Sequence, residues 1–303
     1  MTVTLGAGLP ARADDRCAPP EWRRTRRWAR SSCCCEHGEK LSASVQACFG
    51  TQDTVRCGPY DCHIDSSGLD HAALTAITAR LKGFYELRAA EEPERDPEAL
   101  LRFRKALDAV GLRSGARVLD VGAKWGGLSA VIQAAGLEVD YTGVDLSEAN
   151  IEAGAAAGVR FVHADVTERL PFDDHSFDCV FCLELLEHLI IPLSLLCELR
   201  RVLTENGRVV LSVPSPYSWV EATRELLGRP DPEGHLNAFT TPVMKNLTAL
   251  AGFEIERRAG TSIRIPKTLK LIPTNSILAR SRIYVIRPSS DLAFAGRSVA
   301  SLP

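Results

Sequence analysis

Strand-like and helix-like patterns alternate along residues 117–213, and this alternation constrains the fold more than any other feature of the sequence. Short apolar runs predict strands, and stretches with apolar residues at helical spacing separate most of them. The expected strands are residues 117–121, 139–144, 159–163, 177–182 and 207–213, and the expected helices are residues 126–135, 148–156 and 193–203. Because the crossover between parallel strands runs right-handed across one face of a sheet, the pattern predicts a parallel, doubly wound α/β sheet.

Two later strands are expected at residues 253–257 and 283–286, where they can pair as an antiparallel edge. The expected fold class is α/β, a Rossmann-like doubly wound sheet of seven strands, mostly parallel with an antiparallel C-terminal edge. Two helical patterns before the sheet predict a helical lid. The expected organisation is an N-terminal extension over 1–68, the lid over 69–110, a core over 111–288 with a substrate-facing insertion at 214–250, and a tail over 289–303.

The first 68 residues have an unusual composition. Seven of the chain's ten cysteines lie among residues 1–62, beside an arginine- and tryptophan-rich stretch at 21–30, and no apolar periodicity is visible. We expect a poorly ordered extension here, or alternatively a small metal-bound module in which thiols act with His37 and His63. The metal-bound module is the weaker interpretation, because three of the cysteines are adjacent and this segment has no Cys-x-x-Cys pair.

Charge and hydropathy exclude several classes of protein. The chain of 303 residues has a net charge of −2, so no overall positive field attracts nucleic acid. Its most apolar stretch, residues 179–199, is interrupted by charged residues and a proline and does not predict a membrane span. No signal peptide is visible, so we expect a cytoplasmic protein with reduced thiols and without a membrane partner.

Three of the predicted strands lead into an aspartate, namely Asp120, Asp145 and Asp165. Because the carboxyl ends of parallel strands meet at one edge of a sheet, we expect these side chains at the ligand-binding edge. The turn after Asp120 is rich in glycine and enters a helix, which lets a ligand approach the backbone. It contains neither the G-x-G-x-x-G nor the G-K-[ST] pattern, which disfavours NAD and ATP. Asp145 can accept both hydroxyls of an adenosine ribose.

In this order and at these spacings, the motifs resemble those of the class I S-adenosylmethionine-dependent methyltransferases, in particular the small-molecule branch that includes ubiquinone-type O-methyltransferases. The resemblance covers about residues 110–287. It rests on residues 118–122, 144–147, 164–165, 170–178, 186–189, 199–203 and 206–208. It implies an enzyme that uses S-adenosyl-L-methionine as cofactor and methylates an oxygen, or less favourably a nitrogen or carbon, of a small metabolite.

The resemblance also implies which residues form the cofactor site. Asp120 and Gly122 shape its methionine end. Asp145 binds the ribose, Asp165 binds the adenine amine, and Glu184 lies beside the reacting centre. The full expected set is Asp120, Gly122, Lys124, Gly126, Asp145, Leu146, Asp165, Val166 and Glu184.

One position departs from the family, because Lys124 stands where glycine is usual. Its side chain can point outward, or its ammonium can pair with the methionine carboxylate. It can also crowd the site, which would make the chain a catalytically silent nucleotide- or S-adenosylmethionine-binding module. We expect retained binding, because the other anchors are present, and keep the silent module as an alternative.

A cluster of acids and histidines follows the fourth predicted strand. If Glu184 begins a helix, then Glu184, Glu187 and His188 share one face of it. His235, beyond the fifth strand, is expected to overhang the same pocket. Two carboxylates and two imidazoles suit a divalent metal, and the four residues are the expected metal ligands. The set resembles the metal site of small-RNA 2′-O-methyltransferases, so a metal-assisted RNA 2′-O-methyltransferase is a further alternative.

Without a metal, His188 and His235 are the expected catalytic residues, which take the proton of an acceptor hydroxyl. The expected partner is a small-molecule methyl acceptor. Residues 257–287 carry eight basic residues and no acid, a pattern typical of a solvated face or of a site for an anionic acceptor. RNA is disfavoured, since Tyr284 is the only aromatic residue among these basic ones. The sequence predicts neither the oligomeric state nor the identity of the acceptor.

Overall fold

The computed structural model describes residues 79–84, 86, 96–264 and 270–289, and the backbone of four short strands elsewhere. The expectations for the cysteine-rich segment, apart from the two strands given below, and for residues 69–78, 85 and 87–95 of the lid lie outside the described residues. The chain divides into two compact units, of which the first comprises residues 1–39 and 54–65. The described part of that unit is an antiparallel pair of strands, β1 (Val55–Cys57) and β2 (Tyr60–Cys62).

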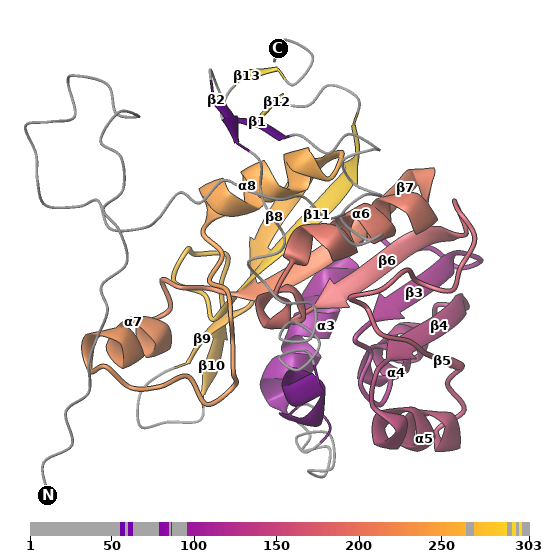
Figure 1. The fold of residues 1–303 in the computed structure, drawn as a ribbon. Helices are drawn as coiled ribbons and strands as arrows, with labels where there is room; N and C mark the ends of the chain where they lie inside the picture. The colour runs from indigo at the N-terminus through magenta and orange to yellow at the C-terminus, as the bar shows by residue number, and fades with distance from the viewer. Residues whose placement is uncertain are drawn as a thin grey trace, which may run out of the picture. The chain divides into compact units, whose positions relative to one another are not determined.

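The second unit is built on a seven-stranded sheet in the order β5-β4-β3-β6-β7-β11-β8 (Figure 1). The strands from β3 to β7 run parallel to one another, whereas β11 lies antiparallel between β7 and β8. This order confirms the predicted Rossmann-like sheet with its antiparallel C-terminal part. The strands are β3 (Arg117–Val121), β4 (Asp140–Asp145), β5 (Phe161–His163), β6 (Phe177–Leu183), β7 (Leu203–Pro214), β8 (Phe253–Gly260) and β11 (Ser281–Pro288).

Helices connect and flank these strands. The N-terminal flank is α3 (Pro97–Val110), which begins where the Asp96 carboxylate accepts the Glu98 N–H and ends at Gly111 in the left-handed conformation. Residues 79–84 are also helical. The later helices are α4 (Gly127–Ala134), α5 (Glu148–Ala156), α6 (Pro192–Val202), α7 (Trp219–Leu226) and α8 (Thr241–Leu250). Two further pairs of short antiparallel strands are β9 (Ser262–Arg264) with β10 (Leu271–Pro273), and β12 (Ala293–Phe294) with β13 (Arg297–Ser298).

Side chains alternate between the two faces of the sheet and so form two apolar cores. Leu119 of β3 belongs to the core that includes the buried leucines of α6 and Met244 of α8. Val118, one residue earlier, belongs to the core that includes α3 and α4. Cys179 and Cys182 of β6 lie one in each core, and burial raises the pKa of both thiols. These two cysteines are therefore apolar packing residues and not reactive thiols.

Arg201 of α6 holds the loop that leads into β6. Its guanidinium donates to the main-chain carbonyls of Leu170 at 3.0 Å and Phe172 at 2.7 Å. The same guanidinium pairs with Asp174 at 2.8 Å and with Glu198 at 2.7 Å. One side chain thus satisfies the backbone of a loop that has no secondary structure of its own.

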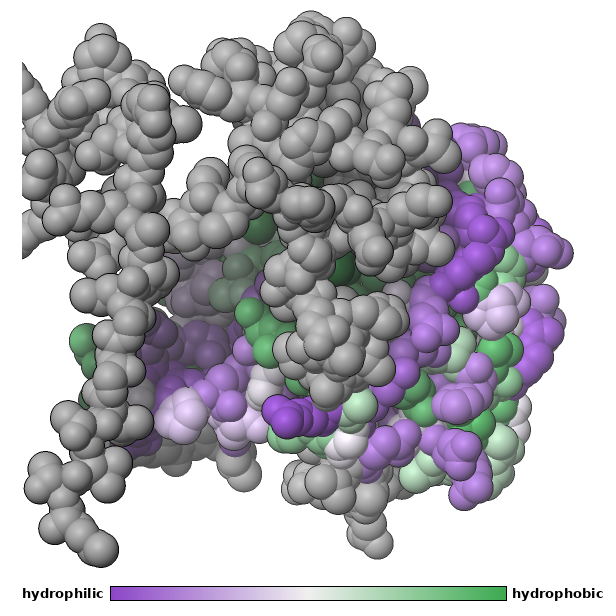
Figure 2. Space-filling view, in the orientation of Figure 1, coloured by the Kyte–Doolittle hydropathy of each residue, from purple (hydrophilic) through white to green (hydrophobic). Residues whose placement is uncertain are grey.

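Among the residues that the structure describes, no helix is long and apolar enough to cross a bilayer. Figure 2 shows hydrophilic and hydrophobic residues interspersed over the described part of one face.

Candidate active site

A cavity of about 630 Å³ opens at the carboxyl ends of the parallel strands. Its wall includes a residue at or just after the end of each of β3 to β7, namely Gly122, Asp145, Asp165, Glu184 and Pro214. The chain winds outward from β3 to β5 and then returns to β6 on the other side of β3, so the cavity lies at the topological switch point. Its volume falls within the range of about 300–1,000 Å³ that is usual for small-molecule pockets.

The turn after β3 keeps the backbone conformation of a glycine-rich loop. Gly122 has a φ of 76°, and a Cβ at this position would lie 3.1 Å from the Leu185 side chain. Lys124 has a φ of 49°, in the left-handed region that favours glycine, although it carries a side chain. Lys124 is exposed and lines the cavity.

Asp145, at the end of β4, is held by three donors. Its carboxylate accepts the main-chain N–H groups of Lys124 at 2.7 Å and Ser147 at 2.9 Å, and the amide of Asn150 at 3.1 Å. The side chain is buried except for the face that lines the cavity. Because a carboxylate has about four lone-pair positions, it retains acceptor capacity for a ligand hydroxyl.

Asp165, after β5, contacts one residue that is close in sequence, Thr167, and one that is distant in sequence, Lys82. One oxygen accepts the main-chain N–H of Thr167 at 2.9 Å and its hydroxyl at 2.7 Å, and the other lies 2.5 Å from the ammonium of Lys82. Burial raises the pKa of Asp165, but the hydrogen bonds from Lys82 and Thr167 outweigh it and leave the pKa below its ordinary value. Asp165 is therefore an ionised acceptor at the cavity wall.

The structure places seven of the nine expected cofactor residues in the cavity wall: Gly122, Lys124, Asp145, Leu146, Asp165, Val166 and Glu184. Asp120 and Gly126 are not among the described residues that line it. The carboxylate of Asp120 is buried and accepts the hydroxyl of Tyr141 at 2.5 Å, and burial raises its pKa to about 7. Gly126 packs closely, because a Cβ there would lie 3.0 Å from Val159.

Glu184 does not begin a helix, so the expected sharing of one helical face with Glu187 and His188 is wrong. Its φ is 52°, and a 3₁₀ turn over Leu186–His188 follows it. Its carboxylate accepts the hydroxyls of Ser212 at 2.8 Å and Ser281 at 3.0 Å, and the guanidinium of Arg102 lies 3.5 Å away. The sequence did not predict these three partners of Glu184, nor Lys82 as a partner of Asp165. The one feature of the sequence that could have indicated them is Ser212, a polar residue inside an otherwise apolar strand.

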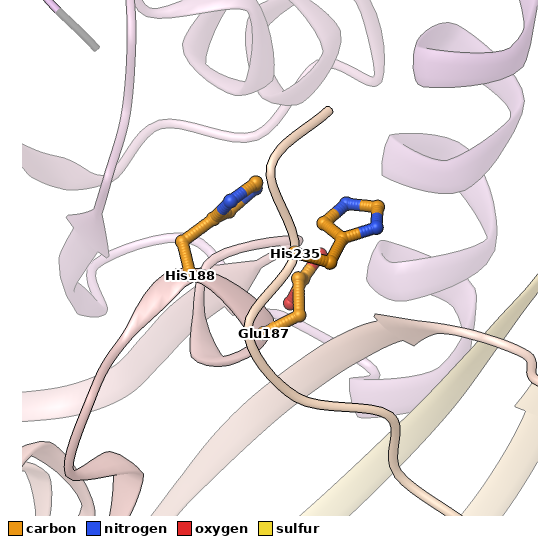
Figure 3. Close-up of side chains that lie close together, drawn as sticks. All are labelled: Glu187, His188 and His235. Carbon is orange, nitrogen blue, oxygen red and sulfur yellow. The ribbon is translucent and has the colours of Figure 1, made fainter. Parts of the chain in front are cut away.

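Three of the four expected metal ligands do meet. One ligand atom each from Glu187, His188 and His235 lie within 4.8 Å of one another, and the two imidazole rings are 4.8 Å apart between centroids (Figure 3). The main-chain carbonyl of Glu187 accepts the N–H groups of Leu236 at 2.8 Å and Asn237 at 3.0 Å. These two bonds fasten the loop that carries His235 to the turn that carries His188.

Glu187 is the unusual member of this cluster. It is 1% exposed, and neither carboxyl oxygen has a hydrogen-bond partner among the described residues. Burial, together with the nearby charge of Glu184, raises its pKa well above the ordinary value. A buried carboxyl group without a partner is costly, which points to a proton or a bound cation as its counterpart.

The comparison with known proteins agrees with this geometry. Residues 92–257 match the family described as the methyltransferase domain, and the chain belongs to this family. A class I methyltransferase fold is also found in a solved structure of a SAM-dependent methyltransferase from Thermotoga maritima, which has a TM-score of 0.51 at 20% identity and covers 63% of this chain and 92% of that chain. The resemblance inferred from the motifs is thereby confirmed.

Two curated relatives show what the similarity covers. A demethylmenaquinone methyltransferase of Clavibacter sepedonicus is 44% identical over 108 residues, which are 34% of this chain and 43% of the relative. A ubiquinone biosynthesis O-methyltransferase of Pseudomonas aeruginosa is 32% identical over 155 residues, which are 48% of this chain and 64% of the relative. The chain thus matches between 43% and 64% of the length of these relatives.

Proposed function

We propose that the chain transfers a methyl group from S-adenosyl-L-methionine to an oxygen of a small metabolite. The observation that carries this proposal is the layout of one cavity. Asp145 and Asp165 lie in its wall after β4 and β5, and His188 and His235 lie in its wall beyond β6. The two aspartates therefore offer hydrogen-bond acceptors for an adenosine group, and the two histidines offer bases that can take a proton. The similarity to a ubiquinone biosynthesis O-methyltransferase supports oxygen as the acceptor atom.

The residues present fit the cofactor. When bound, S-adenosyl-L-methionine supplies a methyl group that its sulfonium already activates. Asp145 would accept a ribose hydroxyl, and Asp165 would accept the adenine amine once Lys82 releases it. Gly122 would leave room for the methionine end. The protein's main contributions are then alignment of the two reactants and exclusion of water from the cavity.

The acceptor hydroxyl must also lose its proton. A histidine near the reacting oxygen can take it, because an imidazole is a competent base close to neutral pH. His188 and His235 both line the cavity, and we assign this role to the pair.

A divalent metal is an alternative proposal for the same cluster, in which the two histidines bind the metal instead of taking the proton. Two imidazoles and one carboxylate form a donor set that suits zinc, iron or manganese, and the unpartnered oxygens of Glu187 support it. Glu184 is left out of this set, since its carboxylate is engaged by Ser212 and Ser281. Elemental analysis of the purified chain tests the proposal: about one equivalent of metal, lost in Glu187→Gln, is expected. A metal-free protein that is unaffected by EDTA would contradict it.

The acceptor is proposed to be a small molecule that needs no anionic group. Of the eight basic residues in 257–287, Arg280 is the described one that lines the cavity, and it pairs with Glu98 at 2.7 Å. Near the tail end of the run, Arg287 pairs with Glu254 at 2.5 Å. A paired guanidinium has little attraction left for an anion or for RNA, which weakens the two alternatives that the sequence left open.

Calorimetric titration of S-adenosylhomocysteine and S-adenosylmethionine into the full chain tests the proposal. We expect binding, and we expect Asp145→Ala to weaken it at least about tenfold, because hydrogen bonds to a charged group contribute about 1.5–3 kcal/mol each. Asp140→Ala is a matched control, since it removes a carboxylate from the opposite, exposed end of β4. If neither ligand gave a heat of binding, the proposal that the chain is a methyltransferase enzyme would be rejected. Labelled S-adenosylmethionine with metabolite extracts then identifies the acceptor.

A further inference from the structure

His235 has an acidic neighbour that the sequence analysis did not single out. The Nδ1 atom of His235 lies 2.6 Å from a carboxylate oxygen of Asp231, and their side chains are 14% and 26% exposed. From this geometry we propose that Asp231 is a positioning residue, which fixes the tautomer and orientation of His235 so that Nε2 is the proton acceptor. The inference deepens the proposed function and rests on it for the identity of the reaction.

The carboxylate of Asp231 is itself held from the other side. Its Oδ1 accepts the main-chain N–H of Glu233 at 2.9 Å and lies 3.6 Å from the guanidinium of Arg224. Its Oδ2 lies on Nδ1 of His235, and the main-chain N–H of His235 also donates to the carboxylate. Arg224 comes from α7 and is in turn held by Glu221 at 2.8 Å, so the pair is braced against a helix.

The helix that braces the pair is also anchored. Its first residue, Trp219, donates its indole N–H to the main-chain carbonyl of Arg264 in β9 at 2.7 Å. On the other side, Leu236 and Asn237 donate to the carbonyl of Glu187, as described above. Asp231 and His235 therefore lie in a loop that is fastened to secondary structure before and after them.

Other contacts of the Asp231 carboxylate come from donors, the main-chain N–H of Glu233 and the guanidinium of Arg224. A carboxylate held among such donors acts as the acceptor in its 2.6 Å contact with Nδ1 of His235. The proton of a neutral His235 therefore lies on Nδ1, facing Asp231, which leaves the lone pair on Nε2.

The consequence for the reaction is a fixed path for one proton. When the acceptor oxygen forms its bond to the methyl carbon, the methyl–sulfur bond would break and its electron pair would remain on sulfur. The O–H bond of the acceptor would also break, and its proton would pass to Nε2 of His235. Asp231 would stabilise the resulting imidazolium through Nδ1–H. A base oriented by a third group in this way recurs on unrelated folds, where its orienting acid contributes substantially to the rate.

The ¹⁵N NMR spectrum of the full chain, labelled at histidine and recorded where imidazoles are neutral, tests the inference without any ligand. The protonated and bare nitrogens of a neutral imidazole resonate far apart, and the His235 signals are assigned by their loss in His235→Gln. We expect the Nδ1–H tautomer in the unmodified chain. We expect a reversal to Nε2–H in Asp231→Asn, because Glu233 N–H holds the amide oxygen and turns the amide nitrogen toward Nδ1.

Two further variants keep the test decisive. Asp231→Ala removes both acceptors and is expected to give a mixture of tautomers, and it serves if Asp231→Asn does not fold. Glu221→Gln alters the other acidic partner of Arg224 and is expected to leave the His235 tautomer unchanged.

An Nε2–H tautomer in the unmodified chain, or an unchanged tautomer in both Asp231 variants, would overturn the inference. Silent calorimetry with S-adenosylmethionine would reject the proposed enzyme and leave this result intact, so the two failures are distinguishable.

Discussion

The main-chain N–H of Lys124 donates to the carboxylate of Asp145 over 2.7 Å, which joins the turn after β3 to the end of β4. The bond comes from the backbone, so it does not depend on which side chain stands at position 124. What it requires is the left-handed backbone of this residue, which has a φ of 49°. Lys124 thus adopts a turn geometry that favours glycine, at the cost of local strain.

Replacement of Lys124 by glycine is expected to stabilise the chain. The left-handed conformation costs a residue with a side chain about 1 kcal/mol, and glycine avoids that cost. Because glycine also loses more backbone entropy on folding, we expect a net gain of about 0.5 kcal/mol in urea denaturation. The affinity for S-adenosylmethionine should stay within about threefold, since the bond to Asp145 comes from the backbone.

Lys124→Ala separates strain from crowding. This variant shortens the side chain and keeps the strained backbone. Much tighter cofactor binding in both variants would show that the lysine side chain obstructs the site, contrary to its exposed position here.

Lys82→Met is expected to tighten binding of S-adenosylmethionine by about 1.5- to 5-fold. The ammonium of Lys82 is paired with Oδ2 of Asp165, the carboxylate proposed to accept the adenine amine, so it would compete with that amine. The lysine side chain is 39% exposed. A partly exposed ion pair contributes about 0.2–1 kcal/mol, which bounds the gain. Calorimetry measures it, with Arg80→Met on the same helix as control. Weaker binding in Lys82→Met would instead mean that the lysine contacts the cofactor.

The buried carboxyl group of Asp120 should make stability depend on pH. Burial raises its pKa from 3.8 to about 7, so between these values the folded chain holds a proton that the unfolded chain has released. The free energy of unfolding then falls as the pH rises through this window, by up to about 1.4 kcal/mol per pH unit.

Asp120→Asn isolates that contribution, because asparagine cannot titrate and can still accept the Tyr141 hydroxyl. Between pH 5 and pH 7 we expect the unmodified chain to lose about 2–3 kcal/mol relative to this variant in urea denaturation. Asp140→Asn, at the exposed start of β4, controls for a simple change of charge. Parallel pH curves for the unmodified chain and Asp120→Asn would contradict the assignment.

Arg201→Met should destabilise the chain by about 2–4 kcal/mol. The variant leaves the carbonyls of Leu170 and Phe172 without this donor and removes the cationic partner of Glu198, which among the described residues retains only the main-chain N–H of Leu170. Partly buried polar groups that lose their partners cost more than a broken surface ion pair. Arg200→Met is the matched control, since Arg200 pairs with the exposed Glu205. Equal effects of the two variants on the free energy of unfolding would show that the loop before β6 needs no such support.

Local signals predicted those parts of the fold that depend on local chemistry. The strand at 117–121 and the helix at 148–156 have the predicted bounds, because apolar runs and the Ser147 cap determine them. The helix expected from Glu184 failed for a tertiary reason. Its carboxylate bonds Ser212 and Ser281, which lie 28 and 97 residues away, and the chain turns in the left-handed conformation to reach them.

The candidate site follows the same division. The strand-end aspartates Asp145 and Asp165 could be predicted, because the topology of a parallel sheet brings strand ends together. Lys82 and Asp231 could not, because each acts through a contact between a helix or loop and a site that sequence spacing does not reveal. The spacing of apolar residues predicts which residues lie on the same face of a helix or strand. It does not predict which residue distant in sequence a side chain contacts.

The two bonds from Leu236 and Asn237 to the Glu187 carbonyl have a consequence for how such an enzyme can diverge. The segment that carries His235 belongs to the stretch between β7 and α8, which lines the cavity with Glu221, Arg224, Glu233 and His235. Under the proposed function, a descendant that exchanged this stretch to accommodate another acceptor would exchange its proton acceptor in the same event. Grafting the loop alone into a relative should then transplant both selectivity and proton transfer, or neither.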